Sequence, residues 1–248
     1  MKILVTGASS IIGESLAAAF SQGNQLVLIG RNPDRLQQVQ ARCLQRGAVQ
    51  VDARAVDIAQ LAPADWREFT NGVNVIVHAS FHLSKKRDDQ IASSELKEAL
   101  AANLVSPLHL FLAAAGGAAQ GQPLCIILIS SFLAKIRSPN RLIYGSLKLL
   151  QEECLKNISR DYPHVRVLVV HVGKVIPTER HSAKADALAE EVVRAYKSGQ
   201  AHLACGLLGS LLVGLFYVQP LLYFAVSATQ RWLRKLNFRS GTTGPNAD

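Results

Sequence analysis

Three side chains in this sequence could together exchange a proton with a carbonyl or alcohol oxygen: Ser131, Tyr144 and Lys148. Tyr144 and Lys148 are four residues apart, so on a helix the phenol and the ammonium project from one face. Ser131 ends an apolar run that lies upstream of this pair. A phenol can donate or accept the proton, an ammonium can tune the phenol pKa, and a hydroxyl can hold the substrate oxygen. The set indicates ketone reduction or alcohol oxidation.

The surrounding chain alternates between short apolar runs and longer amphipathic stretches. The runs are continuous in Val, Ile and Leu, as in parallel strands buried on both faces. This alternation predicts an α/β fold, a Rossmann-like doubly wound parallel sheet of about seven strands, formed by one domain over residues 1–205. The predicted strands cover residues 2–6, 25–30, 49–56, 73–79, 124–131, 165–173 and 201–205. The predicted helices cover residues 11–22, 33–46, 63–70, 91–116, 142–161 and 186–198.

The end of the first predicted strand has the composition of a dinucleotide turn. Gly7 permits a tight turn, Gly13 permits close packing of helix on strand, and the helix N-terminus offers free N–H groups to a pyrophosphate. Arg31 ends the second strand, where it could pair with a ribose 2′-phosphate. We therefore favour NADP(H), with NAD(H) as the alternative. Asp57 could accept a hydrogen bond from the adenine amino group, or it could cap a helix.

The composition limits the partners of the chain. It carries a formal net charge of +9, and 49% of its 248 residues are apolar. The basic residues are not interleaved with aromatic ones, so we predict no nucleic-acid partner and favour a phospholipid surface or an anionic substrate. The four cysteines are scattered, which predicts reduced thiols in a cytosolic setting, and neither Cys nor His has the spacing of a metal site.

The C-terminal part is long and uncharged between Lys197 and Arg231. It has enough apolar residues for one membrane span, but glycines and Pro220 interrupt it, and basic residues follow. We predict a membrane-associating helical extension at residues 206–239, on the cytoplasmic side of the membrane, as a monotopic hairpin or a single span. Residues 240–248 are predicted to be a disordered tail. An extra pair of core or dimer helices is the alternative.

The sequence resembles the short-chain dehydrogenases/reductases over roughly residues 1–200. The motifs that carry the resemblance are Thr6-Gly7-x5-Gly13, Asp57, Asn103, Ser131, Tyr144-x3-Lys148, and Val172-Gly173 followed by Thr178.

The resemblance implies a role for each matched residue. Tyr144 is the general acid in reduction and the base in oxidation, and Ser131 fixes the substrate oxygen. Lys148 lowers the pKa of Tyr144 and binds the nicotinamide ribose, and Asn103 holds a water for proton relay. The cofactor-binding residues implied are Thr6, Gly7, Ser9, Ser10, Ile12, Gly13, Arg31, Asp57, Ile58, His78, Ala79, Ser80, Tyr144, Lys148, Gly173 and Val175.

The chain departs from the family pattern at several positions. Ile11 replaces a glycine of the cofactor turn, which puts cofactor affinity in doubt. His78-Ala79-Ser80 replaces the usual Asn-Ala-Gly, and Val172-Gly173 replaces Pro-Gly. No catalytic group is lost, so a divergent subfamily is indicated. A dinucleotide-binding sensor or scaffold with a vestigial site is the alternative of another class.

One subfamily resembles the chain more closely, the membrane-associated reductases of polyprenyl-phosphate-linked 2-keto-pentoses (the decaprenylphosphoryl-2-keto-ribose type). The likeness rests on Ile12-Gly13, residues 137–146 and 166–170, and the apolar C-terminus. Ketosphinganine reductases also have such a C-terminus, so another lipid ketone is the alternative. Arg137 and Arg141 could bind a substrate phosphate near Tyr144, or could lie in a solvated loop. A homo-oligomer is compatible with the sequence.

Overall fold

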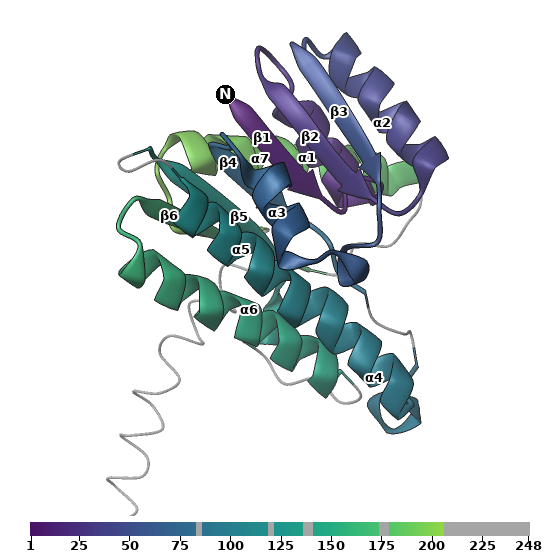
Figure 1. Ribbon diagram of the computed structural model, residues 1–248. Helices are drawn as coiled ribbons and strands as arrows, with labels where there is room; N and C mark the ends of the chain where they lie inside the picture. Colours follow the sequence, from purple (N-terminus) through teal and green to yellow (C-terminus); the bar gives the residue numbers. More distant parts are fainter. Residues whose placement is uncertain (83–85, 119–121, 136–140, 174–178, 206–248) are drawn as a thin grey trace, which may run out of the picture. The chain divides into compact units, whose positions relative to one another are not determined.

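The computed structural model describes residues 1–82, 86–118, 122–135, 141–173 and 179–205, which belong to one compact unit. In it, seven parallel strands form one sheet in the order β3-β2-β1-β4-β5-β6-β7 (Figure 1). The strands are β1 Lys2–Thr6, β2 Gln25–Gly30, β3 Gln50–Ala55, β4 Val75–His78, β5 Leu124–Ser131, β6 Val165–Val172 and β7 His202–Ala204. The predicted doubly wound α/β fold is confirmed. The predicted extension and tail lie outside the described residues.

Helices cover both faces of the sheet, which explains why the strands are apolar throughout (Figure 1). One face packs against α1 Ile11–Ala19, α2 Pro33–Gln45 and α7 Glu179–Lys197. The other face packs against α3 Pro63–Thr70, α5 Ser106–Gly117 and α6 Leu142–Asp161. In β5 every residue from Leu124 to Ser131 is buried, so this strand lies in the centre of the core. The sheet is therefore a rigid platform whose strand ends can hold a site.

The helix predicted over residues 91–116 is interrupted. The structure has α4 Ser93–Leu100, a π-helical turn η3 Ala101–Val105, and then α5. Pro107 in the first turn of α5 lacks the N–H that would bond the carbonyl four residues back, at Asn103. That carbonyl accepts a hydrogen bond from Gln151 of α6 instead, at 2.6 Å. The wide turn follows from this proline, and it directs Asn103 into the protein.

Two predicted helix boundaries are wrong by several residues. Helix α1 ends at Ala19 rather than residue 22, because the Ser21 hydroxyl bonds the Ala17 carbonyl and Gly23 turns the chain with a φ of 70°. Helix α7 begins at Glu179 rather than residue 186, since its polar first turns show no apolar period. Three short 3₁₀ turns complete the described elements: η1 Ile58–Gln60, η2 Asp88–Gln90 and η4 Phe132–Ala134.

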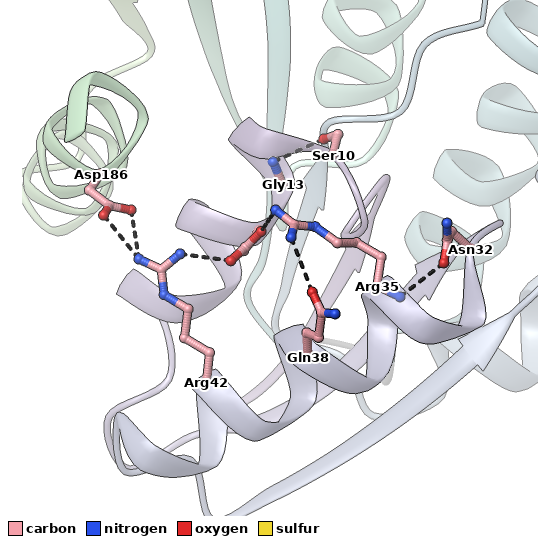
Figure 2. A network of polar contacts seen from close by, with 8 residues as sticks. Ser10, Gly13, Asn32, Arg35, Gln38, Arg42 and Asp186 are labelled. Atoms are coloured by element: carbon pink, nitrogen blue, oxygen red, sulfur yellow. Dashed lines mark hydrogen bonds and ion pairs between the residues drawn. The ribbon is translucent and has the colours of Figure 1, made fainter. Parts of the chain in front are cut away.

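A network of ion pairs joins the three helices of the first face (Figure 2). Glu14 of α1 pairs with Arg35 at 2.6 Å and with Arg42 at 2.9 Å, both on α2. Arg42 also donates to both carboxylate oxygens of Asp186 on α7 at 2.9 Å. Pairs of this kind at a partly exposed site contribute modestly to stability, but a shared network fixes orientation. It holds α1, which begins at the dinucleotide turn, between α2 and α7.

Candidate active site

The chain leaves β1 through a glycine with a left-handed backbone. Gly7 has a φ of 72°, and a Cβ there would lie 2.7 Å from the backbone nitrogen of Ser80. Gly13 packs directly against the Gly7 carbonyl, which leaves no room for a side chain. Ser10 caps α1 by accepting a hydrogen bond from the Gly13 N–H at 3.1 Å. The turn therefore sets the N-terminus of α1 beside the ends of β1 and β4, an arrangement that favours an anionic ligand.

A cavity of about 300 Å³ lies at the carboxyl ends of β1 to β4. The strand order reverses between β1 and β4, and ligands of doubly wound sheets bind at such a switch point. The predicted cofactor residues that line this cavity are Gly7, Ser9, Ser10, Ile12, Arg31, Asp57, Ile58, Ala79 and Ser80. The lining residues that the sequence did not predict are Ile11, Gly30, Val56, Phe81, His82 and Ala102.

Two of the predicted cofactor residues support the cavity wall from behind. Thr6 and His78 end neighbouring strands, are fully buried, and hydrogen-bond each other through Oγ1 and Nδ1 at 2.8 Å. Burial and, to a lesser extent, the Lys148 charge lower the pKa of His78 to about 3. His78 is therefore neutral at physiological pH. The pair fixes the chain at Ala79 and Ser80, which do line the cavity.

Arg31 and Asp57 lie in the cavity wall, as their predicted roles require. Arg31 is exposed, and its Nη1 lies 3.2 Å from Nδ1 of His82, across the cavity mouth from β2 to the end of β4. Asp57 caps η1, accepting from the Ala59 N–H at 3.1 Å. The alternative interpretation of Asp57 as a cap therefore holds, and its place in the wall leaves the cofactor role open.

Ile11 and Gly30 determine how much space the cavity has beside the glycine turn. Ile11 lines the cavity beside the turn. Gly30 ends β2, and a Cβ there would lie 2.7 Å from Ser9 Oγ. Together with Gly7, this glycine keeps the cradle open at backbone level. A cradle that a Cβ would fill, a helix N-terminus and a basic residue at the end of β2 are the features that a bound dinucleotide needs, so the residues present fit that cofactor.

The structure brings the three predicted catalytic side chains to one place. Ser131 is the last residue of β5, and its hydroxyl accepts a hydrogen bond from the Leu133 N–H at 3.2 Å. It also lies close enough to the phenol of Tyr144, in the first turn of α6, to lower the pKa of that phenol. Gly145 permits this contact, because a Cβ there would collide with the Leu133 carbonyl. Helix α6 can therefore approach the end of β5 closely enough for Ser131 and Tyr144 to meet.

The electrostatics of Tyr144 differ from the predicted balance. Burial raises the pKa of Tyr144, and the Ser131 hydrogen bond and the Arg141 charge oppose that rise. Lys148 instead donates to the Ile129 carbonyl at 2.8 Å, and its own pKa is lowered to about 7 by burial. In this arrangement the phenol is neutral at neutral pH. The expected direct effect of Lys148 on Tyr144 is not seen here.

Phe81 connects the cavity to the catalytic pair. It lines the cavity, and its ring lies edge-on to that of Tyr144 with centroids 4.7 Å apart. The Lys148 ammonium lies 4.5 Å from the Phe81 centroid, within range of a cation–π contact. The sequence signal for Phe81 was only its place directly after Ala79 and Ser80 at the end of β4. These contacts place Tyr144 and Lys148 next to the cavity, against the Phe81 ring that lines it.

The side chain of Asn103 hydrogen-bonds to backbone groups around it. It is fully buried, its Oδ1 accepts from the His82 N–H at 2.7 Å, and its Nδ2 donates to the carbonyls of His82 and Ala99. Its own carbonyl accepts from Gln151. These contacts clamp the segment that carries Phe81. The predicted water-holding role of Asn103 stays a prediction, and its side chain already makes three hydrogen bonds to the backbone of His82 and Ala99.

The remaining predicted residues have mixed outcomes. Arg137 and Val175 lie outside the described residues. Gly173 is exposed and sits beside Phe132. Arg141 is exposed and near enough for its charge to lower the pKa of Tyr144. Lys135, two residues before Arg137 in the sequence, pairs with the buried Glu152 at 2.7 Å.

Comparison with known proteins identifies the family. The model described as short chain dehydrogenase matches residues 1–192. The chain belongs to this family. Among curated short-chain dehydrogenase relatives, a hydroxysteroid 11-beta-dehydrogenase 1-like protein of Xenopus tropicalis is 29% identical over 168 residues, which is 64% of this chain and 58% of the relative. A short chain dehydrogenase/reductase of Aspergillus aculeatus is 28% identical over 186 residues, 69% of this chain and 62% of the relative. The matches thus span about three fifths of these relatives.

Solved structures of the short-chain dehydrogenase fold resemble this chain. The bulky-bulky ketone specific alcohol dehydrogenase of Comamonas testosteroni has a TM-score of 0.74 at 17% identity, with 100% of this chain and 97% of the other covered. An alcohol dehydrogenase of Thermococcus sibiricus in complex with 5-hydroxy-NADP has a TM-score of 0.67 at 22% identity, with 79% and 90% covered. At this identity the likeness shows the fold.

Proposed function

We propose that this short-chain dehydrogenase is an NAD(P)H-dependent ketone reductase and alcohol dehydrogenase. The observation that carries the proposal is the meeting of Ser131, Tyr144 and Lys148 at one end of a cavity built for a dinucleotide. Family membership supports the same chemistry. When bound, the nicotinamide cofactor supplies or accepts the hydride.

The protein residues handle the proton and the substrate oxygen. The raised pKa of Tyr144 keeps its phenol protonated at neutral pH, so it can donate a proton to the carbonyl oxygen during reduction. The Ser131 hydroxyl, which lies beside that phenol, can hold the same oxygen. While it is protonated, Lys148 adds a positive charge beside the site. That charge stabilises the negative charge that develops on the Tyr144 oxygen when the phenol donates its proton. In oxidation the Tyr144 phenolate takes the proton back from the alcohol in the same geometry.

NADP(H) is the favoured cofactor. Arg31 lies in the cavity wall at the end of β2, where a 2′-phosphate would give it a charge-assisted bidentate partner. Its contact with His82 holds the guanidinium at the mouth. A relative in the comparison is bound to 5-hydroxy-NADP and another to NAD+, so both cofactors occur on this fold.

The substrate we favour is a ketone on an anionic lipid, in its most specific form a polyprenyl-phosphate keto-sugar. The Arg141 charge reaches Tyr144 and would attract a phosphate beside the reacting carbonyl. The uncharged sequence after Lys197, followed by basic residues, supports a membrane-associated chain at the cytoplasmic face. A ketosphinganine-type or other lipid ketone is the alternative substrate.

The membrane association does not follow from the described helices. In the described ranges one helical run, Ser93–Gly117, is long and apolar enough to cross a membrane, but half of its most apolar window is buried in the domain. Leu110 and Phe111 of that run pack against the sheet. The run is therefore a core helix, and the proposed membrane contact depends on residues 206–239.

The substrate proposal is tested with detergent-solubilised enzyme and NADPH. We compare three ketones: one on a polyprenyl phosphate, a ketosphinganine, and a short soluble ketone. The proposal predicts the highest kcat/KM for the phosphate lipid, and a selective rise in its KM for Arg141→Gln. Arg160→Gln, far along α6 and exposed, is the control. Equal kcat/KM for the soluble ketone, or an Arg141→Gln effect on all three, contradicts the lipid-linked substrate.

A dinucleotide sensor is the second candidate, and Ile11 in the cavity wall is the observation that favours it. A branched side chain beside the phosphate turn reduces the space that a working enzyme needs for repeated cofactor exchange. Tight cofactor binding without turnover of any ketone or alcohol would support the sensor. Turnover by the wild type excludes a vestigial site.

A further inference from the structure

A buried carboxylate lies behind the catalytic residues. Glu152 on α6 is 6% exposed. Its Oε2 pairs with Lys135 at 2.7 Å, and its Oε1 accepts from the Ser130 hydroxyl and from Nε2 of His171 at 3.0 Å. These three partners come from β5, from the loop that follows it, and from β6. Buried charges are rarely kept unless they are paired, and this one has three partners. Such a hub ties four segments together at one point.

The spacing along α6 links this hub to the active site. Tyr144, Lys148 and Glu152 are one turn apart, so they share a face of the helix. They face three consecutive residues at the end of β5: Tyr144 lies beside the Ser131 hydroxyl, Lys148 donates to the Ile129 carbonyl, and Glu152 accepts from the Ser130 hydroxyl. The two hydrogen bonds of Lys148 and Glu152 act as a clamp between α6 and β5. Because Ser130 is covalently next to Ser131, the Glu152 bond limits how far Ser131 can move from the phenol.

Charge is the second link between Glu152 and the site. Burial lowers the pKa of Lys148 to about 7, and the Glu152 charge opposes this fall. Burial would raise the pKa of Glu152, but hydrogen bonds from His171, Lys135 and Ser130 lower it to about 2, so the carboxylate stays ionised. The other titratable groups that face this region are His78 at the end of β4 and His202 on β7, stacked on His171. Glu152 is thus a fixed negative charge one turn from the catalytic ammonium.

We propose that Glu152 is a positioning residue of the reductase site, which clamps the Ser131 end of β5 onto α6 and places a negative charge one helical turn from the Lys148 ammonium. The inference rests on the proposed function for its catalytic consequence. Its effect on the charge of Lys148 holds whether or not the protein turns over a ketone. Glu152 does not touch the substrate, so it acts only through Ser131 and Lys148.

Three variants separate the two effects of Glu152, its hydrogen bond to β5 and its negative charge near Lys148. Glu152→Gln removes the charge and keeps the shape, Glu152→Asp keeps the charge, and Ser130→Ala removes the bond to β5 while leaving the carboxylate in place. Glu153→Gln is the matched control, because Glu153 is the next residue of α6 and is exposed, with a loose pair to Lys156 at 3.6 Å. Each variant is characterised by kcat against pH and by the NMR titration of ε-¹³C-labelled lysine, with Lys148→Met used to assign the Lys148 signal.

The expected results follow from the geometry. In Glu152→Gln the Lys148 titration moves to lower pH by about one unit, a tenfold change in its acid constant. Its kcat then falls most at neutral and higher pH and recovers in part at lower pH, where Lys148 is protonated again. Ser130→Ala loses about tenfold in kcat, the scale of one hydrogen bond to a charged group, without that titration shift. Glu152→Asp recovers part of the activity, and Glu153→Gln matches the wild type.

Two results overturn the proposal. One is an unchanged Lys148 titration and pH profile in Glu152→Gln, with only a lower melting temperature, because that is what a purely structural residue gives. The other is wild-type kcat in Ser130→Ala, which decides the clamp even if Glu152→Gln does not fold. If the wild type turns over no ketone, the proposed function fails, whereas the Lys148 titration still decides the role of Glu152.

Discussion

Lys148 meets two opposing demands. Its positive charge serves the site, yet the side chain is only 3% exposed, and burial lowers its pKa from 10.5 to about 7. Between these two values the unfolded chain binds more protons than the folded one, so stability rises with pH across that window. Catalysis needs the protonated form, which is lost as pH rises through about 7. Function and stability therefore change in opposite directions at this residue.

We expect Lys148→Met to stabilise the protein while inactivating it. Its melting temperature should exceed that of the wild type by about 5 °C or more near pH 6, where the buried ammonium is mostly charged, and this difference should narrow toward pH 10. Thermal melts at several pH values measure this. Lys156→Met, at an exposed position of the same helix, should show neither the gain nor its pH dependence. A gap that is constant with pH contradicts the assigned pKa shift.

Arg31 is expected to set the cofactor preference. Arg31→Ala should weaken NADPH about 10- to 100-fold, the cost of one charge-assisted contact, and leave the NADH dissociation constant nearly unchanged. Fluorescence titration with both cofactors provides the comparison. Arg54→Ala, on β3 and paired with Asp52 at 2.8 Å, is the control. An equal loss of affinity for NADPH and NADH would mean that Arg31 shapes the mouth of the cavity and does not bind a 2′-phosphate.

At the scale of elements, the sequence predicted the strands well because each is a continuous apolar run bounded by turns. β1, β2, β5, α3 and α6 have the predicted bounds, and the other elements differ mainly at their ends. The π turn before α5 was missed because apolar periodicity does not show how a proline will redistribute hydrogen bonds. The Tyr144–Lys148 spacing was visible, but the contacts of Phe81 and Glu152 join elements far apart in the chain. Only the packing of β4, β5 and β6 around α6 reveals them.

The packing of α6 on η4 gives an element-scale prediction. In Gly145→Ala a methyl group would meet the Leu133 carbonyl, so α6 must shift away from the end of β5. We expect a loss of about 1–3 kcal/mol in unfolding free energy and at least a tenfold fall in kcat, with cofactor affinity little changed. Urea unfolding and steady-state kinetics measure both. Ser146→Ala, one residue on and exposed, should stay within about 0.5 kcal/mol of wild type. Matching results for the two variants would disprove the close-contact argument.

At the scale of the whole molecule, the net charge and the apolar C-terminal sequence predict binding to anionic membranes. The full-length protein should sediment with vesicles that contain phosphatidylglycerol and less with neutral ones. Replacement of Arg231, Arg234, Lys235 and Arg239 by Gln should weaken binding by about 1 kcal/mol per residue. The matched control replaces four basic residues of the described domain: Arg35, Arg46, Arg67 and Lys97. Equal sedimentation of both variants, or no sedimentation of the wild type, contradicts the membrane role of residues 206–239.

In the proposed function, Tyr144 transfers the proton in a nicotinamide-dependent reaction. The most direct test follows the absorbance of NADPH during turnover of a ketone by wild type and by Tyr144→Phe, with the NADPH dissociation constant measured for both. We expect a rate lower by about 10²- to 10⁴-fold in the variant, at nearly unchanged cofactor affinity. Equal rates in the two proteins would contradict it.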